Sequence, residues 1–263
     1  MENANLKVID FYNCIDEFAP FMTQTSWDNS GLLAGKFDNR VTGVLLALDV
    51  HEHVVDEAIK LGANLIVSHH PIMFSGRKNL REDDPEANML CKIVRNNINV
   101  ISAHTNFDAA RGGVNDALAD IIGLKNIETI EADDEGFLRI GDIDEITLEK
   151  LTEQVRNRLG DAVRSYGARD KIIKRVAVCG GSAGEFAITA YKAGADAYIT
   201  GEMRYHDCID LAQKGFATLQ AGHDATEKQS LKVLEAEFKQ LTASTDIKIT
   251  LSQCDCLSAT AFT

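Results

Sequence analysis

Short apolar runs that lead into histidine constrain the fold of this 263-residue chain more than any other feature. Three such runs are followed by clustered polar residues: 65–68 by His69 and His70, 99–103 by His104 and Asp108, and 217–221 by His223 and Glu227. Their β-branched residues are typical of buried strands, and Pro71 predicts a turn just past the first one. Taken alone, the His69-His70 pair is equally consistent with a capped loop residue beside a solvent-facing one.

Helical patterns separate these runs, and the alternation predicts an α/β fold with mainly parallel sheets. Ligands of open α/β sheets bind beyond the carboxyl ends of the strands. We therefore expect the histidines and carboxylates after the three runs to converge on one site. Another strand end, after 197–200, carries Glu202 and His206, which together with His104 are candidates for acid/base chemistry.

The length favours one large or two medium domains. Short polar connections and a predicted edge strand around 124–135 indicate a boundary, which gives domains 1–125 and 126–263. In the second domain we expect one helix from 225 to about 241 and a closing strand at 247–251.

Composition excludes several classes of protein. Forty acidic residues against 27 basic ones give a net charge of −13, which argues against nucleic-acid binding through a basic face. Neither a leader peptide nor an apolar run of about 18–20 residues is present, so we expect a cytoplasmic protein that does not span a membrane. The six cysteines form no CxxC pair, as expected of reduced thiols.

Three other stretches have alternative interpretations. Trp27 lies in a turn-rich stretch and is interpreted as a packing anchor. Asp28 and Asn29 could instead orient the histidines without binding a metal themselves. The charged segment 76–86 is either a solvated connection, which we favour, or a loop that closes over an anion. The glycine-rich turn 180–184 is either a phosphate-binding loop or a tight turn without ligand.

Imidazole and carboxylate ligands without thiolate suit a divalent first-row metal: Zn, Fe, Mn, Co or Ni. Five or more such ligands exceed what a closed site for one metal uses, so we predict two metal ions per chain.

Six motifs, in this order, carry a resemblance to a known family: WDNSGLLAG, SHHP, HTNFDAARGGVND, GGSAGEF, DAYITGEMRYHD and AGHDATE. The chain resembles the NIF-three-like family, whose bacterial members are often labelled GTP cyclohydrolase type-2 homologues. The resemblance implies two α/β domains with a dinuclear metal site in the cleft between them, and a homohexameric ring of dimers or trimers. We also expect the C-terminal helix to pack back across the cleft. The metal ligands that it implies are His69, His70, Asp108, His223 and Glu227, with Glu227 as a bridge and His104 as a near neighbour.

The function predicted from these features is a metal-dependent hydrolase that acts on a nucleotide or a similar small anion. The alternative is a hexamer that binds metal for regulation or metal delivery and has no catalytic turnover.

Overall fold

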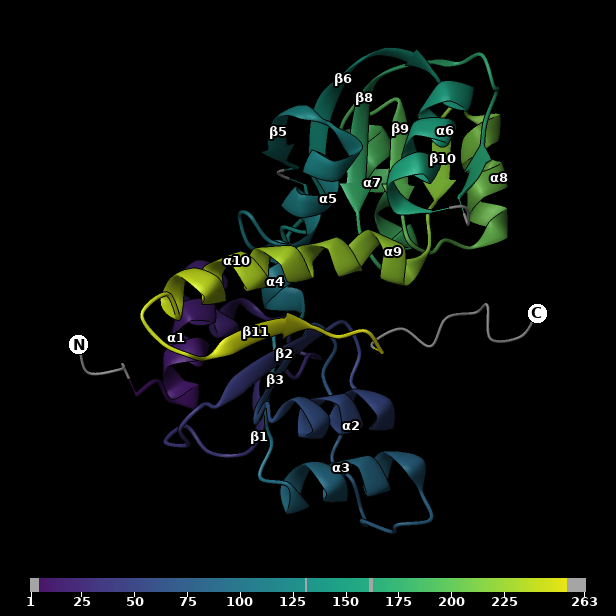
Figure 1. Cartoon of the computed structure of the whole chain (residues 1–263). Helices are drawn as coiled ribbons and strands as arrows, with labels where there is room; N and C mark the ends of the chain where they lie inside the picture. The colour runs from purple at the N-terminus through teal and green to yellow at the C-terminus, as the bar shows by residue number, and fades with distance from the viewer. Residues whose placement is uncertain (1–4, 131, 161–162, 255–263) are drawn as a thin grey trace. The chain divides into compact units, whose positions relative to one another are not determined.

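The computed structural model describes residues 5–130, 132–160 and 163–254, and the chain divides into two compact units (Figure 1). Unit 1 comprises Met1–Phe107 and Leu231–Thr263, and unit 2 comprises Asp108–Ser230. This division differs from the predicted boundary at residues 125 and 126. The reason is that α5 (Val114–Ile122) packs on the sheet of unit 2, while the last helix and strand return to unit 1.

Unit 1 contains a five-stranded sheet in the order β1-β4-β3-β2-β11. Its strands are β1 (Gly31–Ala34), β2 (Gly43–Ala47), β3 (Leu65–Ser68), β4 (Asn99–Ser102) and β11 (Lys248–Leu251). All neighbours are parallel except β1, which pairs antiparallel with β4 at the edge. The mainly parallel sheet is thus confirmed here. The prediction that 247–251 completes the second half of the fold is wrong, because β11 pairs with β2.

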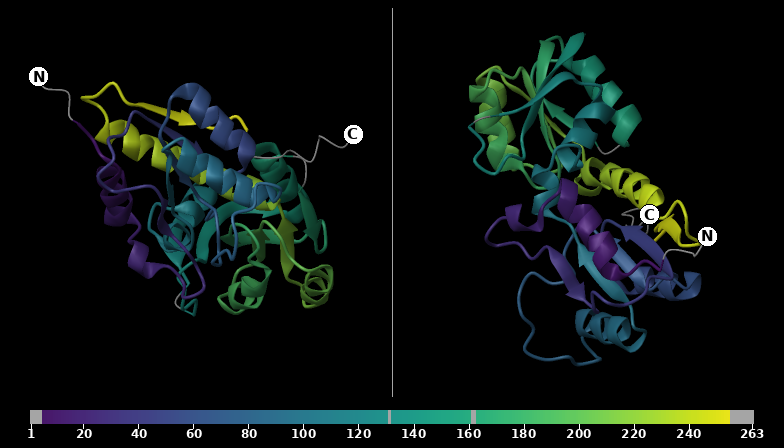
Figure 2. Two further views of the ribbon diagram at one scale, coloured as in Figure 1. Left: turned by 90° about the horizontal axis from the view of Figure 1, so that it is seen from below. Right: turned by 90° about the vertical axis from the view of Figure 1, so that its left-hand side faces the viewer.

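Helices cover both faces of this sheet. In Figure 2, α2 (Glu52–Leu61) and α3 (Pro85–Arg95) lie on one face, and α1 (Val8–Phe18) and α10 (Leu231–Leu241) lie on the other. The first pair buries an apolar core against β2, β3 and β4. On the opposite face, Phe11 of α1 packs edge-to-face on Phe238 of α10. The result is a three-layer α/β/α unit. The helices cover the two faces of the sheet, and the polar residues lie at the carboxyl ends of its strands.

Unit 2 contains a six-stranded sheet in the order β5-β6-β8-β9-β10-β7. Its strands are β5 (Lys125–Thr129), β6 (Arg139–Thr147), β7 (Arg164–Tyr166), β8 (Ile172–Cys179), β9 (Ala197–Thr200) and β10 (Ala217–Gln220). The central strands β8, β9 and β10 are parallel, and antiparallel strands flank them on both sides. This sheet is therefore mixed, although its centre has the predicted parallel arrangement.

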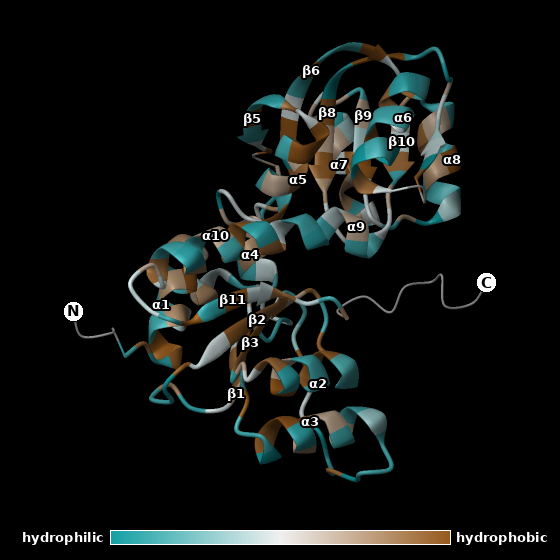
Figure 3. Cartoon of the chain, viewed as in Figure 1, coloured by the Kyte–Doolittle hydropathy of each residue, from teal (hydrophilic) through white to brown (hydrophobic). Residues whose placement is uncertain are grey.

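Two apolar clusters sandwich the second sheet. One lies between the sheet and the helices α5 and α6 (Leu148–Leu159), and Thr147 caps α6 by accepting from the backbone N–H of Lys150. The other lies between the sheet and α7 (Ala187–Lys192) and α8 (Tyr205–Gln213). Figure 3 shows that the central strands are hydrophobic and that the helices have both hydrophobic and hydrophilic residues. This pattern is typical of helices that pack one apolar face on a sheet.

The expected single helix over 225–241 is wrong. The segment consists of α9 (His223–Glu227), a 3₁₀ turn η3 (Lys228–Ser230) and α10. The hydroxyl of Ser230 donates to the carbonyl of Glu227 at 2.7 Å, and the chain passes from unit 2 to unit 1 immediately after it. The short elements η1 (Phe21–Thr23), α4 (Thr105–Ala109) and η2 (Gly184–Phe186) complete the described chain. Within that part of the chain, no helix is long and apolar enough to cross a bilayer.

Candidate metal centre

Three histidines lie together at the carboxyl end of the sheet in unit 1. His69 and His70 follow β3, and their backbone N–H groups continue the parallel ladder by donating to Ala47 and Leu48. His104 follows β4, the next strand. The ring of His69 lies 5.0 Å from that of His70 and 5.1 Å from that of His104. One potential ligating atom from each residue lies within 4.8 Å of the others, so the predicted convergence of these two strand ends is confirmed.

Each of these imidazoles is held through Nδ1. The Nδ1 of His69 is 2.9 Å from the carbonyl oxygen of Ala103, and that of His70 is 2.8 Å from Oδ1 of Asp49. The Nδ1 of His104 is 2.8 Å from Oδ1 of Asp28. A carbonyl or carboxylate oxygen can only accept, so Nδ1 carries a proton in all three rings, and in the neutral imidazole the lone pair is then on Nε2. Metal-binding histidines in proteins have this arrangement, in which the second nitrogen donates to an oxygen.

Asp28 fixes His104 from a fully buried position. Its side chain has no exposed surface, and it also accepts from the N–H and hydroxyl of Thr105, the hydroxyl of Ser30 and the N–H of Asn29. Burial by itself would raise the pKa of Asp28, but the hydrogen bonds from His104 and Thr105 outweigh it and hold the pKa well below its ordinary value. The predicted supporting role of Asp28 is borne out by this geometry. Asn29 contributes differently, by donating to the carbonyl of Met73 at 2.7 Å.

Unit 2 has its own set of donors at the carboxyl ends of β9 and β10. His223 begins α9 and Glu227 ends it, one helical turn later. The Nε2 of His223 lies 3.2 Å from Oε2 of Glu227, and its Nδ1 lies 3.6 Å from Oε2 of Glu202. Two ligands of one metal ion lie about 3 to 3.4 Å apart when each bond is about 2.1 Å long. The separation of the His223 and Glu227 donor atoms therefore fits coordination of one ion.

Asp108, the remaining predicted ligand, lies in α4 and belongs to the same carboxylate-rich region of unit 2. Burial, and then the carboxylates of Asp108, Asp133 and Glu227, raise the pKa of the buried Cys179 thiol well above its ordinary value. Cys179 is the last residue of β8. The carboxylates of Asp108 and Glu227 therefore both lie close enough to the end of this strand to interact electrostatically with the thiol. The backbone carbonyl of Asp108 accepts from Asn115 at 3.1 Å.

The glycine-rich turn after β8 packs against α9. The N–H of Gly180 donates to Asn115 and that of Gly181 donates to the hydroxyl of Thr226. Gly181 has a φ of 64°, and a Cβ there would lie 2.1 Å from Oε1 of Glu227. These contacts favour the tight turn over the phosphate loop, because both N–H groups already have protein acceptors.

Other predicted residues have different environments. His206 is exposed in the first turn of α8 with its ring against Tyr205, and among the described residues no contact joins it to His223 or Glu227. The interpretation of Trp27 as a packing anchor is wrong, because its side chain is 58% exposed. Sequence reasoning missed the role of Asp49 as partner of His70. Its position directly after an apolar strand, like that of the histidines themselves, was the available signal.

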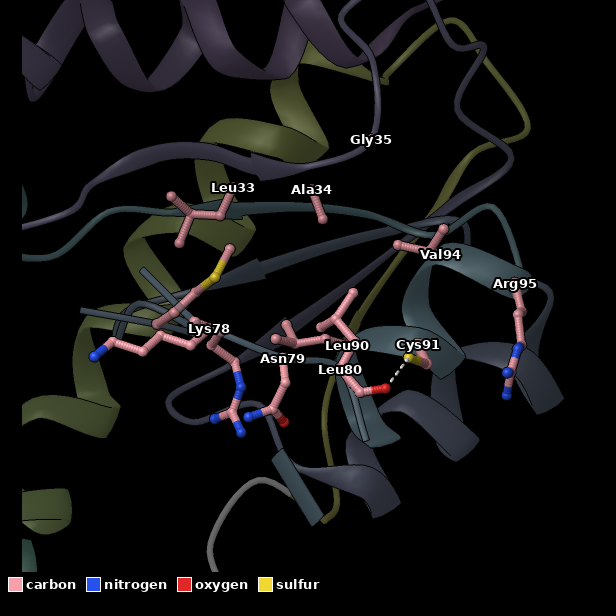
Figure 4. A pocket seen from close by; sticks show the side chains of 12 residues that line it. Leu33, Ala34, Gly35, Lys78, Asn79, Leu80, Leu90, Cys91, Val94 and Arg95 are labelled. Atoms are coloured by element: carbon pink, nitrogen blue, oxygen red, sulfur yellow. Dashed lines mark hydrogen bonds between the residues drawn. The ribbon is translucent and has the colours of Figure 1, made fainter. Parts of the chain in front are cut away.

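A separate pocket of about 770 Å³ opens in unit 1 beside α3 (Figure 4). Its lining is mostly apolar and includes Leu33, Leu80, Leu90 and Val94, with neither histidine nor carboxylate among the lining residues. The pocket is therefore chemically distinct from the metal-binding candidates.

The charged segment 76–86 forms one wall of this pocket. Arg77 pairs with Asp84 and Glu86, and Arg81 pairs with Asp83. Because these arginines are paired with acids of the same segment, a solvated connection is favoured over a loop that closes on an anion.

Comparison with known proteins gives consistent matches over almost the whole chain. A family model described as Duf34/NIF3 (NGG1p interacting factor 3) matches residues 6–256. A Clostridium acetobutylicum protein named GTP cyclohydrolase 1 type 2 homolog is 34% identical, over 95% of this chain and 98% of its own. A protein of the same name from Clostridium perfringens is 33% identical, over 94% and 97% of the two chains. The crystal structure of the Staphylococcus aureus hypothetical protein SA1388 has a TM-score of 0.87 at 30% identity and covers 95% of this chain and 97% of its own.

Proposed function

The chain belongs to the Duf34/NIF3 family, and on this premise we propose that it is a divalent-metal-dependent hydrolase with a dinuclear centre. We further propose that its substrate is a nucleotide or a similar small anion, as the cyclohydrolase name of its relatives suggests. The observation that carries the proposal is the trio of His69, His70 and His104, in which each Nδ1 donates to an oxygen, so that each neutral ring has its lone pair on Nε2. An imidazole cluster of this kind suits a first-row divalent metal.

Both units contribute ligands in this proposal. The proposed ligands are His69 and His70 from unit 1 and Asp108, His223 and Glu227 from unit 2, and His104 is either a further ligand or an acid/base group. Neither set alone supplies enough donors for two ions, whereas together they do. The ions would be Zn, Fe, Mn, Co or Ni, two per chain.

When bound, such metals lower the pKa of a coordinated water to near 7 and polarise a phosphoryl or carbonyl oxygen. The residues of the chain would have two roles beside the metal: some orient the ligand rings, and others transfer protons. Asp28 and Asp49 fix the His104 and His70 rings in one tautomer. Glu202, whose carboxylate is exposed 3.6 Å from His223, is placed to exchange a proton with solvent or substrate. His206 remains a proposed acid/base group on the basis of its position after β9.

The first test is the metal content of untagged protein purified without chelator, measured by elemental analysis. We expect about two equivalents per chain. His223→Ala should lose at least one of them, because Glu227 and Asp108 alone cannot replace the imidazole. The control is His53→Ala, an exposed histidine in the first turn of α2, which should retain the full content. Absence of metal in the unmodified protein, even after titration with each ion, would refute the proposal.

The second test is turnover of the metal-loaded protein with a panel of nucleotides, with His223→Ala as the inactive control. Hydrolysis that disappears in the folded variant supports the hydrolase. Two bound metals without hydrolysis of any nucleotide would instead favour the non-catalytic metal-binding hexamer. We propose the homohexamer in either case, and light scattering should give a mass six times that of one chain.

A further inference from the structure

Two exposed aromatic side chains flank His104. Trp27 is 58% exposed and Phe74 is 54% exposed. Both rings meet the His104 ring edge-to-face, with centroids 5.8 Å and 5.7 Å away and interplanar angles of 76° and 70°. Their own centroids are 6.4 Å apart, and the two ring planes are tilted by 35° relative to one another.

The backbone beneath these rings is held firmly, so their exposure is not a consequence of a loose loop. Asp28, next to Trp27, accepts the buried hydrogen bonds described above. Asn29 donates its side-chain amide to the carbonyl of Met73, next to Phe74, and so ties the two loops together. The chain thus fixes two large aromatic side chains in solvent, although burying them would be favourable by itself.

We propose that Trp27 and Phe74 form a stacking platform for the purine base of a nucleotide, which they hold beside His104. This inference deepens the proposed function and rests on it, because it names the part of the substrate that the protein recognises. Every base has a π-face, and stacking on aromatic side chains contributes substantially to binding. Phosphate or ribose alone would gain nothing from such a platform, so the proposal predicts that affinity depends on the base.

Trp27 is the one tryptophan of the chain, so fluorescence excited at wavelengths that tyrosine does not absorb reports on this position alone. The experiment titrates metal-loaded, assembled protein with GTP, and in parallel with ribose 5-phosphate and with inorganic tripolyphosphate. We expect saturable quenching by GTP, after correction for its absorption, and none by the two compounds without a base. Phe74→Leu should lower the affinity for GTP by about tenfold, in line with the loss of one stacking partner.

The matched control is Phe37→Leu, another exposed phenylalanine of unit 1, whose ring contacts Tyr12 and no residue of the site. It should bind GTP as the unmodified protein does. Equal quenching by tripolyphosphate, no quenching by GTP, or an equal loss of affinity in both leucine variants would overturn the platform. So would an emission already blue-shifted and insensitive to acrylamide, because Trp27 would then be covered by another copy of the chain.

Elemental analysis of the same samples separates this inference from the proposed function. Full metal content without a base-dependent response refutes the platform and leaves the metal centre intact. Absence of metal refutes the proposed function, and a base-dependent response after treatment with chelator would show that the platform binds purines independently of metal.

Discussion

At the scale of single residues, the two aspartates that hold His70 and His104 make the same hydrogen bond in different surroundings. Both pairs have an N···O distance of 2.8 Å, but the side chain of Asp28 is fully buried and that of Asp49 is 49% exposed. Solvent screens the Asp49 pair and competes for its atoms. The orientation of His104 should therefore depend on its aspartate much more than the orientation of His70 does.

We expect Asp28→Asn to lower the free energy of unfolding by about 2–4 kcal/mol at neutral pH, because it removes a buried charge that accepts several hydrogen bonds. Asp49→Asn should cost less than about 1 kcal/mol. Urea denaturation with chelator present measures both. Equal losses in the two variants would contradict the difference that burial predicts.

The same substitution should change how stability depends on pH. Because the folded protein holds the pKa of Asp28 below its unfolded value of about 3.9, the contribution of its carboxylate is complete above that pH. It is lost progressively as pH falls from there through the folded pKa. The difference between the unmodified protein and Asp28→Asn should thus be constant from about pH 5 to 7 and shrink below about pH 4. A difference that grows on acidification would refute this assignment.

At the scale of elements, glycine at the end of β8 lets α9 approach closely. Gly181→Ala should displace the carboxylate of Glu227, because the added Cβ would lie 2.1 Å from its Oε1. We expect a loss of about 3 kcal/mol in unfolding free energy, from overpacking and positive φ together, and a reduced metal content.

Gly194→Ala is the matched control for this substitution. Its φ of 83° is also positive, but no atom lies within 4 Å of the added Cβ. It should cost only the backbone strain of about 1–2 kcal/mol and leave metal content unchanged. Retention of full metal content in Gly181→Ala would show that Glu227 is not required at its observed position.

The strand ends that carry histidine were predictable from the sequence because each signal is local. An apolar run followed directly by a polar residue marks a carboxyl end, and parallel pairing then brings His69 and His104 to the same edge. The grouping of these two strand ends needed no information beyond the alternation of strands and helices.

Features that depend on distant pairing were not predictable in this way. The pattern of 247–251 indicates a strand but not its partner, and β2 lies about 200 residues earlier in the chain. The break between α9 and α10 has neither Gly nor Pro to mark it and follows from the division of the chain into units. The exposure of Trp27 was missed because composition does not reveal on which side of a loop a ring projects.

At the scale of the whole molecule, unit 2 is an insertion in the chain of unit 1. Unit 2 is continuous from Asp108 to Ser230, and its sheet and both apolar clusters are made of its own residues. The buried Arg139 guanidinium is also satisfied within the unit, by Asp116 and by the carbonyls of Gly136, Ala109 and Ala110. Unit 1, in contrast, needs chain from both sides of the insertion, since β11 and α10 cover β2 and α1.

We therefore expect residues 108–230 to fold as an independent fragment with cooperative thermal unfolding, since their range is that of an ordinary domain. Residues 1–107 alone should fail to fold, because they leave β2 unpaired on one side and the apolar face of α1 without Phe238. Joining 1–107 to 231–263 through a flexible Gly/Ser linker should restore folding. Circular dichroism and calorimetry of the three fragments measure this, and a cooperatively folded 1–107 fragment would refute the requirement for the returning helix and strand.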